Sequence, residues 1–186
     1  MDYSGNKAAM GQDRASSETE SIVSMNLSKD GKTLDLTATY LKEYGAKDIS
    51  QMEKLRPLTN LAFGTNLCGP KGAKWLAQSN VLVNLTSLNL FYNKIGNEGV
   101  KYIAVSDNLL SLQNLVITDN EITDEGAITL AKFLPLFTNL LRLDLRLNRI
   151  KEDGKNALKG AQNNSSVKHL LSVSYTHLTL PTKRIV

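Results

Sequence analysis

The sequence predicts an α/β solenoid in which short parallel strands form one face and helices cover the other. An asparagine returns every 27 or 28 residues, a short run of alternating apolar residues precedes each asparagine, and a helical apolar pattern follows it. The asparagines are Asn66, Asn93, Asn120 and Asn148. A fixed period of this length is typical of repeat proteins, whose units stack side by side.

The strand of each unit is marked by apolar residues that recur at fixed distances before the asparagine. Leu88 and Leu90 alternate, as expected for a short strand with one buried face. A strand this short cannot bury its apolar face alone, so neighbouring units must pair into a parallel sheet. The four complete sets are Leu58, Leu61 and Phe63; Leu85, Leu88 and Leu90; Leu112, Leu115 and Ile117; and Leu140, Leu143 and Leu145.

The helix of each unit follows the asparagine, where the apolar spacing changes to three and four residues. Val100, Ile103 and Ala104 show this spacing in one unit. A glycine stands at a fixed place before each such run, and we expect it to permit a tight helix–turn geometry. These glycines are Gly72, Gly99, Gly126 and Gly154, and the nearby acidic residues Glu98, Asp124, Glu125 and Glu152 suit a helix N-terminus.

The asparagines are predicted to be structural. Where the chain leaves a strand, its backbone groups cannot all pair within the sheet. An inward amide side chain has donors and an acceptor, so a column formed by Asn66, Asn93, Asn120 and Asn148 would satisfy those groups unit by unit.

These residues resemble the leucine-rich repeat family. The segments NKIGNEGVKYIA and NEITDEGAITLA are similar to its ribonuclease-inhibitor-like subclass, and the resemblance covers about residues 31–171. A weaker first unit has Thr39 in the asparagine column. The resemblance implies a horseshoe segment with a parallel β-sheet on the concave face, helices on the convex face, and a role in protein binding.

The two ends of the chain depart from the repeat. We expect a flexible arm over residues 1–20, followed by a repeat domain over residues 21–171 that contains an N-terminal cap, about five repeats and a truncated sixth. The cap is predicted to be strand, turn, strand, beginning at residue 21. Residues 172–182, SVSYTHLTLPT, resemble a translated sequencing-library adapter, so 172–186 is interpreted as a non-native tail and the chain as a fragment. A divergent natural cap is the alternative.

Composition argues against several classes of partner. The chain has 22 basic and 18 acidic residues, and without Lys183 and Arg184 of the tail 20 basic residues remain. The sequence contains no cluster of basic residues of the kind that would indicate nucleic-acid binding. No apolar run approaches the roughly 18 residues of a membrane-spanning helix. Cys68, the single cysteine, occupies an inward position, so it is predicted to be a small buried hydrophobe rather than a reactive thiol. We expect a cytoplasmic monomer.

The sequence offers no set of catalytic groups. Its histidines are His169 and His177, and Cys68 lies about four repeats from the first of them. No metal-ligand spacing or glycine-rich phosphate loop occurs. The acidic segment 118–126 does not fit a calcium loop, because Ile122 faces inward in the repeat frame. The prediction is a non-enzyme without cofactor or metal.

The candidate site is the concave face, toward which the strand residues that alternate with the buried leucines point. Aromatic residues and arginine are common binding anchors. Exposed strand aromatics can equally favour strand structure and packing between strands, and the sequence leaves both interpretations open. The proposed partner-binding residues are Asn89, Phe91, Tyr92, Thr118, Asp119, Arg142, Asp144 and Arg146.

The predicted function is a protein–protein interaction module. One alternative is a GTPase-activating protein of the Ran-activator type, a family expected to carry an acidic C-terminal region. Another is the sensor or effector arm of a larger immune or pathogen protein. A ribonuclease inhibitor is disfavoured, because it should be acidic to attract basic enzymes and rich in cysteine.

Overall fold

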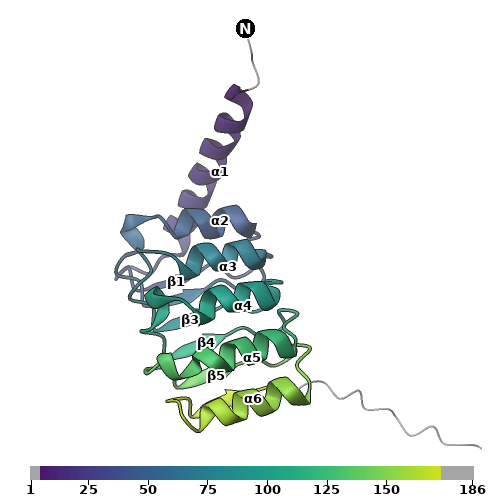
Figure 1. Cartoon of the computed structure of the whole chain (residues 1–186). Coiled ribbons are helices and arrows are strands. Elements are labelled where there is room, and N and C mark those ends of the chain that lie inside the picture. The colour runs from purple at the N-terminus through teal and green to yellow at the C-terminus, as the bar shows by residue number, and fades with distance from the viewer. Residues whose placement is uncertain (1–4, 173–186) are drawn as a thin grey trace, which may run out of the picture.

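The computed structural model describes residues 5–172, with side chains from residue 16 onward, and confirms the predicted α/β repeat stack. In this range six strands form one parallel sheet in the order of the sequence (Figure 1). The register places Leu34, Leu61, Leu88, Leu115 and Leu143 opposite one another in adjacent strands. The strands are β1 (Thr33–Asp35), β2 (Asn60–Ala62), β3 (Ser87–Asn89), β4 (Asn114–Val116), β5 (Arg142–Asp144) and β6 (His169–Leu171).

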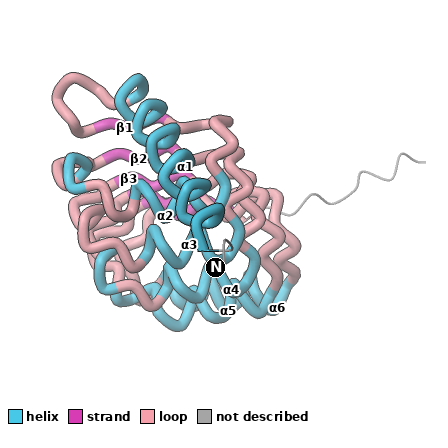
Figure 2. Tube along the Cα trace, turned by 90° about the horizontal axis from the view of Figure 1, so that it is seen from above, coloured by secondary structure: helices cyan, strands magenta, loops and turns pink. Residues whose placement is uncertain are grey.

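Helices alternate with the strands and cover one face of the sheet (Figure 2). Within residues 5–172 no helix covers the other face of the sheet, which is called the open face below (Figure 2). The helices are α1 (Gly5–Asn26), α2 (Lys42–Ile49), α3 (Gly69–Ala77), α4 (Gly96–Ala104), α5 (Asp124–Phe133) and α6 (Glu152–Gln162). Short 3₁₀ turns lie at η1 (Glu53–Leu55), η2 (Asp107–Leu109) and η3 (Leu134–Leu136).

The core is one continuous apolar layer between the strands and the helices. The central leucine of each strand from β1 to β5 is at most 2% exposed. Val100 and Ile103 of α4 and Leu130 of α5 close the layer from the helix side. Each such side chain contributes about 1.5–3 kcal/mol when fully buried, so the stack is stabilised mainly by contacts between neighbouring units.

The asparagine column joins each unit to the one before it. The amide of Asn120 donates to the carbonyl of Leu90 at 2.8 Å and to that of Thr118 at 3.0 Å. Its Oδ1 accepts the N–H groups of Asn93 at 3.0 Å and Ile95 at 3.3 Å. Asn66, Asn93 and Asn148 also bond to backbone groups of the preceding unit. The turns after β1, β2, β3 and β4 are therefore each closed by the asparagine of the following unit.

The N-terminal segment differs from the prediction. Residues 5–20 of the expected arm and the strand expected from residue 21 lie in one helix, α1, so the predicted first strand is wrong. Thr19 and Val23 are buried and Ile22 is half-buried, a three-and-four spacing that gives the helix one packed face. Leu27 forms an antiparallel bridge with Leu34, so the chain does reverse over residues 28–31. Residues 173–186, which include most of the adapter-like segment, lie outside the described residues.

The repeated glycines allow close packing both at the turn into each helix and between neighbouring helices. None of the four has a positive φ. A Cβ added at Gly99 would lie 2.6 Å from Cβ of Ile95, in the turn before α4, and 3.2 Å from Cβ of Ala73 in α3. A Cβ at Gly154 would lie 2.7 Å from Cγ2 of Ile150 and 2.9 Å from Cβ of Ala127 in α5. The glycine thus permits the tight helix–turn geometry expected from the sequence and also lets each helix approach the preceding one.

We predict that Gly99→Ala lowers the free energy of unfolding by about 1–3 kcal/mol, because the added methyl overpacks the contacts with Ile95 and with Ala73 of α3. Gly160→Ala in α6 is the matched control, since a Cβ there meets nothing within 4 Å. That control should gain about 0.5–1 kcal/mol, as alanine favours the helix. Urea denaturation followed by circular dichroism measures both. Equal effects of the two substitutions would contradict the packing role.

We predict that Asn120→Ala lowers the free energy of unfolding by about 1–3 kcal/mol or more, because it leaves buried backbone groups unpaired. Asn156→Ala, at an exposed position of α6, is the control and should change stability little. The same urea titration compares them. A loss of stability no larger for Asn120→Ala than for the control would show that the column is dispensable.

Candidate protein-binding face

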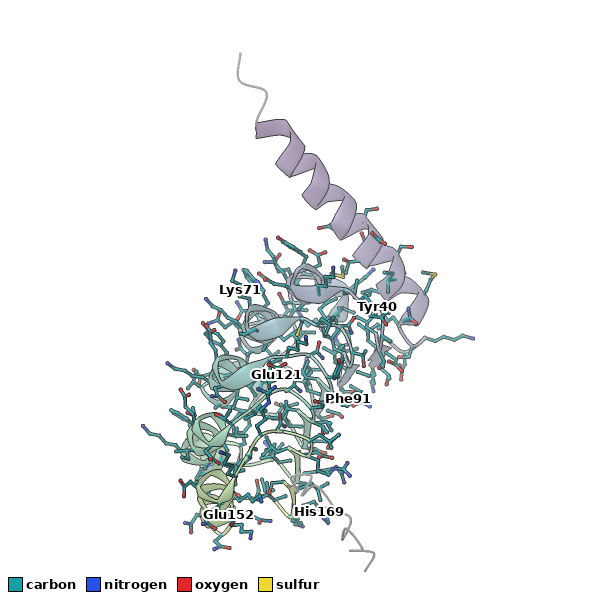
Figure 3. The ribbon with its side chains drawn as sticks, turned by 90° about the vertical axis from the view of Figure 1, so that its right-hand side faces the viewer. Tyr40, Lys71, Phe91, Glu121, Glu152 and His169 are labelled. Carbon is teal, nitrogen blue, oxygen red and sulfur yellow. The ribbon has the colours of Figure 1, made fainter. Side chains whose placement is uncertain are left out.

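The open face is formed by the outward side chains of the strands and of the second and third residues after each strand. Phe91 and His169 lie on the sheet side of the molecule, whereas Lys71 and Glu152 lie on the helix side (Figure 3). The strand register arranges the open face into columns of residues from successive units. One column contains Asn60, Ser87, Asn114, Arg142 and His169, and the next contains Ala62, Asn89, Val116, Asp144 and Leu171.

Phe91 and Tyr92 are the aromatic residues of this face. They are 37% and 40% exposed, and their ring centroids lie 6.0 Å apart with the planes tilted by 40°. Residues next to each other in a strand point to opposite faces. Tyr92 departs from this alternation because its φ of 52° lies in the left-handed region. The chain turns there, and the side chain of Asn93 then points inward. Both rings therefore reach the surface.

The position of Phe91 is set by its neighbours on the sheet. The Oδ1 atom of Asn89 accepts the N–H of Phe91 at 2.9 Å, which fixes the start of the turn. Gly64 occupies the corresponding position in the preceding unit, and a Cβ there would lie 3.6 Å from Cβ and 3.7 Å from Cδ1 of Phe91. These are ordinary van der Waals distances, so Phe91 lies directly beside Gly64 on the sheet.

Arg142, Asp144 and Arg146 form an ion-pair cluster on the fifth unit. The Nη2 atom of Arg142 donates to Oδ2 of Asp144 at 3.2 Å. Arg146 donates to the same carboxylate from Nε at 2.9 Å and from Nη2 at 2.7 Å. The side chains of Arg142 and Arg146 are 44% and 50% exposed, whereas that of Asp144 is 2% exposed. A buried carboxylate thus holds two guanidinium groups at the surface.

The pKa of Asp144 reflects two opposing effects. Burial raises the pKa, but hydrogen bonds from the Arg146 side chain and backbone, together with its charge, outweigh burial and hold the pKa below the usual aspartate value. The carboxylate in turn raises the pKa of Arg146. Asp144 is therefore ionised at neutral pH and remains a counter-ion for the arginines.

Two of the eight candidate residues do not have the exposure expected of them. Thr118 is 7% exposed and Asp144 is 1% exposed, so neither offers the surface that a partner would touch. Strand alternation predicts the side of the sheet correctly but not the depth, and the long arginine side chains cover Asp144. Asn89 and Asp119 are half-buried, and Phe91, Tyr92, Arg142 and Arg146 are exposed.

Cys68 lies in the core, in the inward position that Ile95 and Ile122 occupy in later units. Burial raises the pKa of its thiol to about 12, so the thiolate needed for nucleophilic or metal chemistry does not form at neutral pH. Among residues 5–172, no three His, Cys, Asp or Glu side chains gather to hold a metal ion. Within the same described range, no helix is long and apolar enough to span a membrane.

Comparison with known proteins agrees with this architecture. The family model described as Leucine Rich repeat matches residues 81–104 and 108–131, the units that contain β3 with α4 and β4 with most of α5. Together with the strand–helix stack, these two matches support a leucine-rich repeat protein. Such repeats are generally protein-interaction modules. No curated protein matches the chain.

We predict that Asp144→Asn removes part of the acid dependence of stability. Because the folded pKa of Asp144 is depressed, the carboxylate stabilises the fold above its unfolded pKa, and this contribution is lost as pH falls through the folded pKa. The wild-type free energy of unfolding should therefore fall more steeply than that of the variant between about pH 5 and pH 2. Urea titrations across this range measure the difference.

The control for this experiment is Asp153→Asn, at an exposed position of α6. It should keep the wild-type dependence on pH, since the ion-pair cluster is untouched. Parallel curves for wild type and Asp144→Asn would show that the carboxylate does not stabilise the folded state.

Proposed function

We propose that the chain is a protein-interaction module that docks a partner protein on its open face. The observation that carries this proposal is the aromatic pair Phe91 and Tyr92, held at the surface by the turn after β3. Rigid aromatic side chains bury much apolar area at a low cost in conformational entropy, and they are common at the centres of interfaces.

The architecture supports a docking role rather than catalysis. Helices pack against one face of the sheet and leave the columns of the open face accessible (Figure 2). The exposed arginines of the fifth unit offer polar contacts beside the aromatic anchor. We propose that the chain does not act as an enzyme by itself and that it binds its partner as a monomer. A single cysteine, buried in the core, fits a reducing compartment such as the cytoplasm.

The proposal is tested by selecting peptides from a random display library on the immobilised chain. Such a library samples short sequences of every chemistry, so the natural partner need not be identified first. We expect selected peptides to lose at least about tenfold in affinity for Phe91→Ala/Tyr92→Ala, because truncation of two central anchors costs several kcal/mol in many interfaces. Fluorescence anisotropy with labelled copies of the selected peptides measures the affinities.

The matched control removes apolar surface from the helix side. Val105 follows α4 and Ile128 lies in α5, and each is 47% exposed. Val105→Ala/Ile128→Ala should leave the affinities unchanged, while circular dichroism shows that both double variants are folded. Peptides that bind the aromatic variant as tightly as wild type would mean that the open face is not the docking surface.

A further inference from the structure

We propose that the partner segment bound by the open face carries an apolar side chain beside an acidic one, the first held by Phe91 and Tyr92 and the second by Arg142 and Arg146. This inference rests on the proposed docking function and specifies the chemistry of the partner. It depends on two features of the open face, the aromatic pair on the third unit and the arginine pair on the fifth.

The two features lie at a fixed spacing because the sheet register continues beyond the strands. The N–H of Tyr92 donates to the carbonyl of Thr118 at 3.0 Å, and that of Asp119 donates to the carbonyl of Arg146 at 3.0 Å. Phe91, Thr118 and Arg146 therefore occupy one column on three successive units. Two strand spacings separate the backbones of Phe91 and Arg146 by about 10 Å. A short peptide segment spans this distance.

The arginine pair is preorganised for a carboxylate. In the described part of the chain, Arg142 hydrogen-bonds Asp144 through Nη2 alone, and Arg146 does so through Nε and Nη2. Donor groups of both guanidiniums remain for an external anion. Since Asp144 holds the two side chains in place, less rotamer entropy is lost on binding, and guanidinium geometry suits a carboxylate.

The charge of the face favours a protein segment over a nucleic acid. Asp144 offsets one of the two arginine charges, and Asp119 lies half-buried in the adjacent column, between Tyr92 and Leu147. A polyphosphate needs several unopposed cations along its path. A single carboxylate that binds Arg142 needs only one unopposed cation. Arg142 also lies away from the column that contains Asp119. The chemistry that fits is therefore one acidic side chain next to an apolar one.

The test uses three labelled probes in fluorescence anisotropy: a random copolymer of glutamate and tyrosine, polyglutamate, and oligothymidylate. We expect the copolymer to bind most tightly, because it alone offers both chemistries. Arg142→Gln should weaken copolymer binding by about tenfold, and Phe91→Ala/Tyr92→Ala by a similar factor. Lys71→Gln, on the helix side, makes the same change in net charge and should have no effect (Figure 3).

Arg142→Gln keeps both contacts between the Arg146 side chain and Asp144, so it preserves the buried ion pair. The triple variant R142Q/D144N/R146Q removes the cluster without leaving a buried charge unpaired, and it should abolish the preference for acidic probes. Circular dichroism and urea titration establish that each variant is folded before binding is compared.

Several outcomes would overturn the inference. These are copolymer binding that Arg142→Gln leaves unchanged, polyglutamate bound as tightly as the copolymer, or oligothymidylate bound more tightly than either. Library peptides that depend on Phe91 and Tyr92 but not on Arg142 would overturn the acidic requirement and leave the docking function standing. Library peptides with no dependence on the aromatic pair would instead remove the docking function itself.

Discussion

The stack depends on closing the turns that follow β1 to β4, because backbone groups in each turn bond to the next unit as well as to their own. The asparagine of the next unit supplies the bonds between units. At the turn that holds Phe91 and Tyr92, Oδ1 of Asn120 accepts the N–H of Asn93 at 3.0 Å while its amide donates to the carbonyl of Leu90 at 2.8 Å. Each unit is thus completed by its C-terminal neighbour, and the aromatic pair is positioned by a residue that lies one repeat away.

Backbone strain at the same turn explains why two consecutive side chains reach the open face. Tyr92 and Lys94 both have left-handed φ values on either side of Asn93, and Thr65 and Leu67 repeat this around Asn66. A non-glycine residue in this conformation costs about 1–3 kcal/mol, which the surrounding structure must offset. The asparagine bonds and the buried leucines do so. The proposed docking residues and the interactions that stabilise the stack are therefore parts of one turn.

Much of this architecture could be predicted from the sequence, because two spacings of apolar residues indicate the strands and the helices. Alternation identified the buried leucines of the strands, and a three-and-four spacing identified the helices. Other features depend on information that spacing does not contain. The side of the sheet on which Asp144 lies follows from alternation, but its burial follows from two arginines, each two residues away, that fold over it. The segment around Ile22 and Val23 fits a strand by composition, and only packing against the first unit makes it part of a helix.

The division of roles among the columns explains how one fold presents a specific surface. The leucine, glycine and asparagine positions must be nearly the same in every unit, since each packs against or bonds to the neighbouring unit. The outward positions meet no such demand, and they differ from unit to unit: Gly64, Phe91, Thr118 and Arg146 share one column. The proposed partner would therefore be recognised by the order of side chains along the stack rather than by any single unit. Because neighbouring strands lie about 4.8 Å apart, the order of the units also fixes the distances between the outward side chains of one column. A substitution of one outward residue therefore changes the chemistry at one point along the stack, while the inward residues that stabilise the fold stay the same.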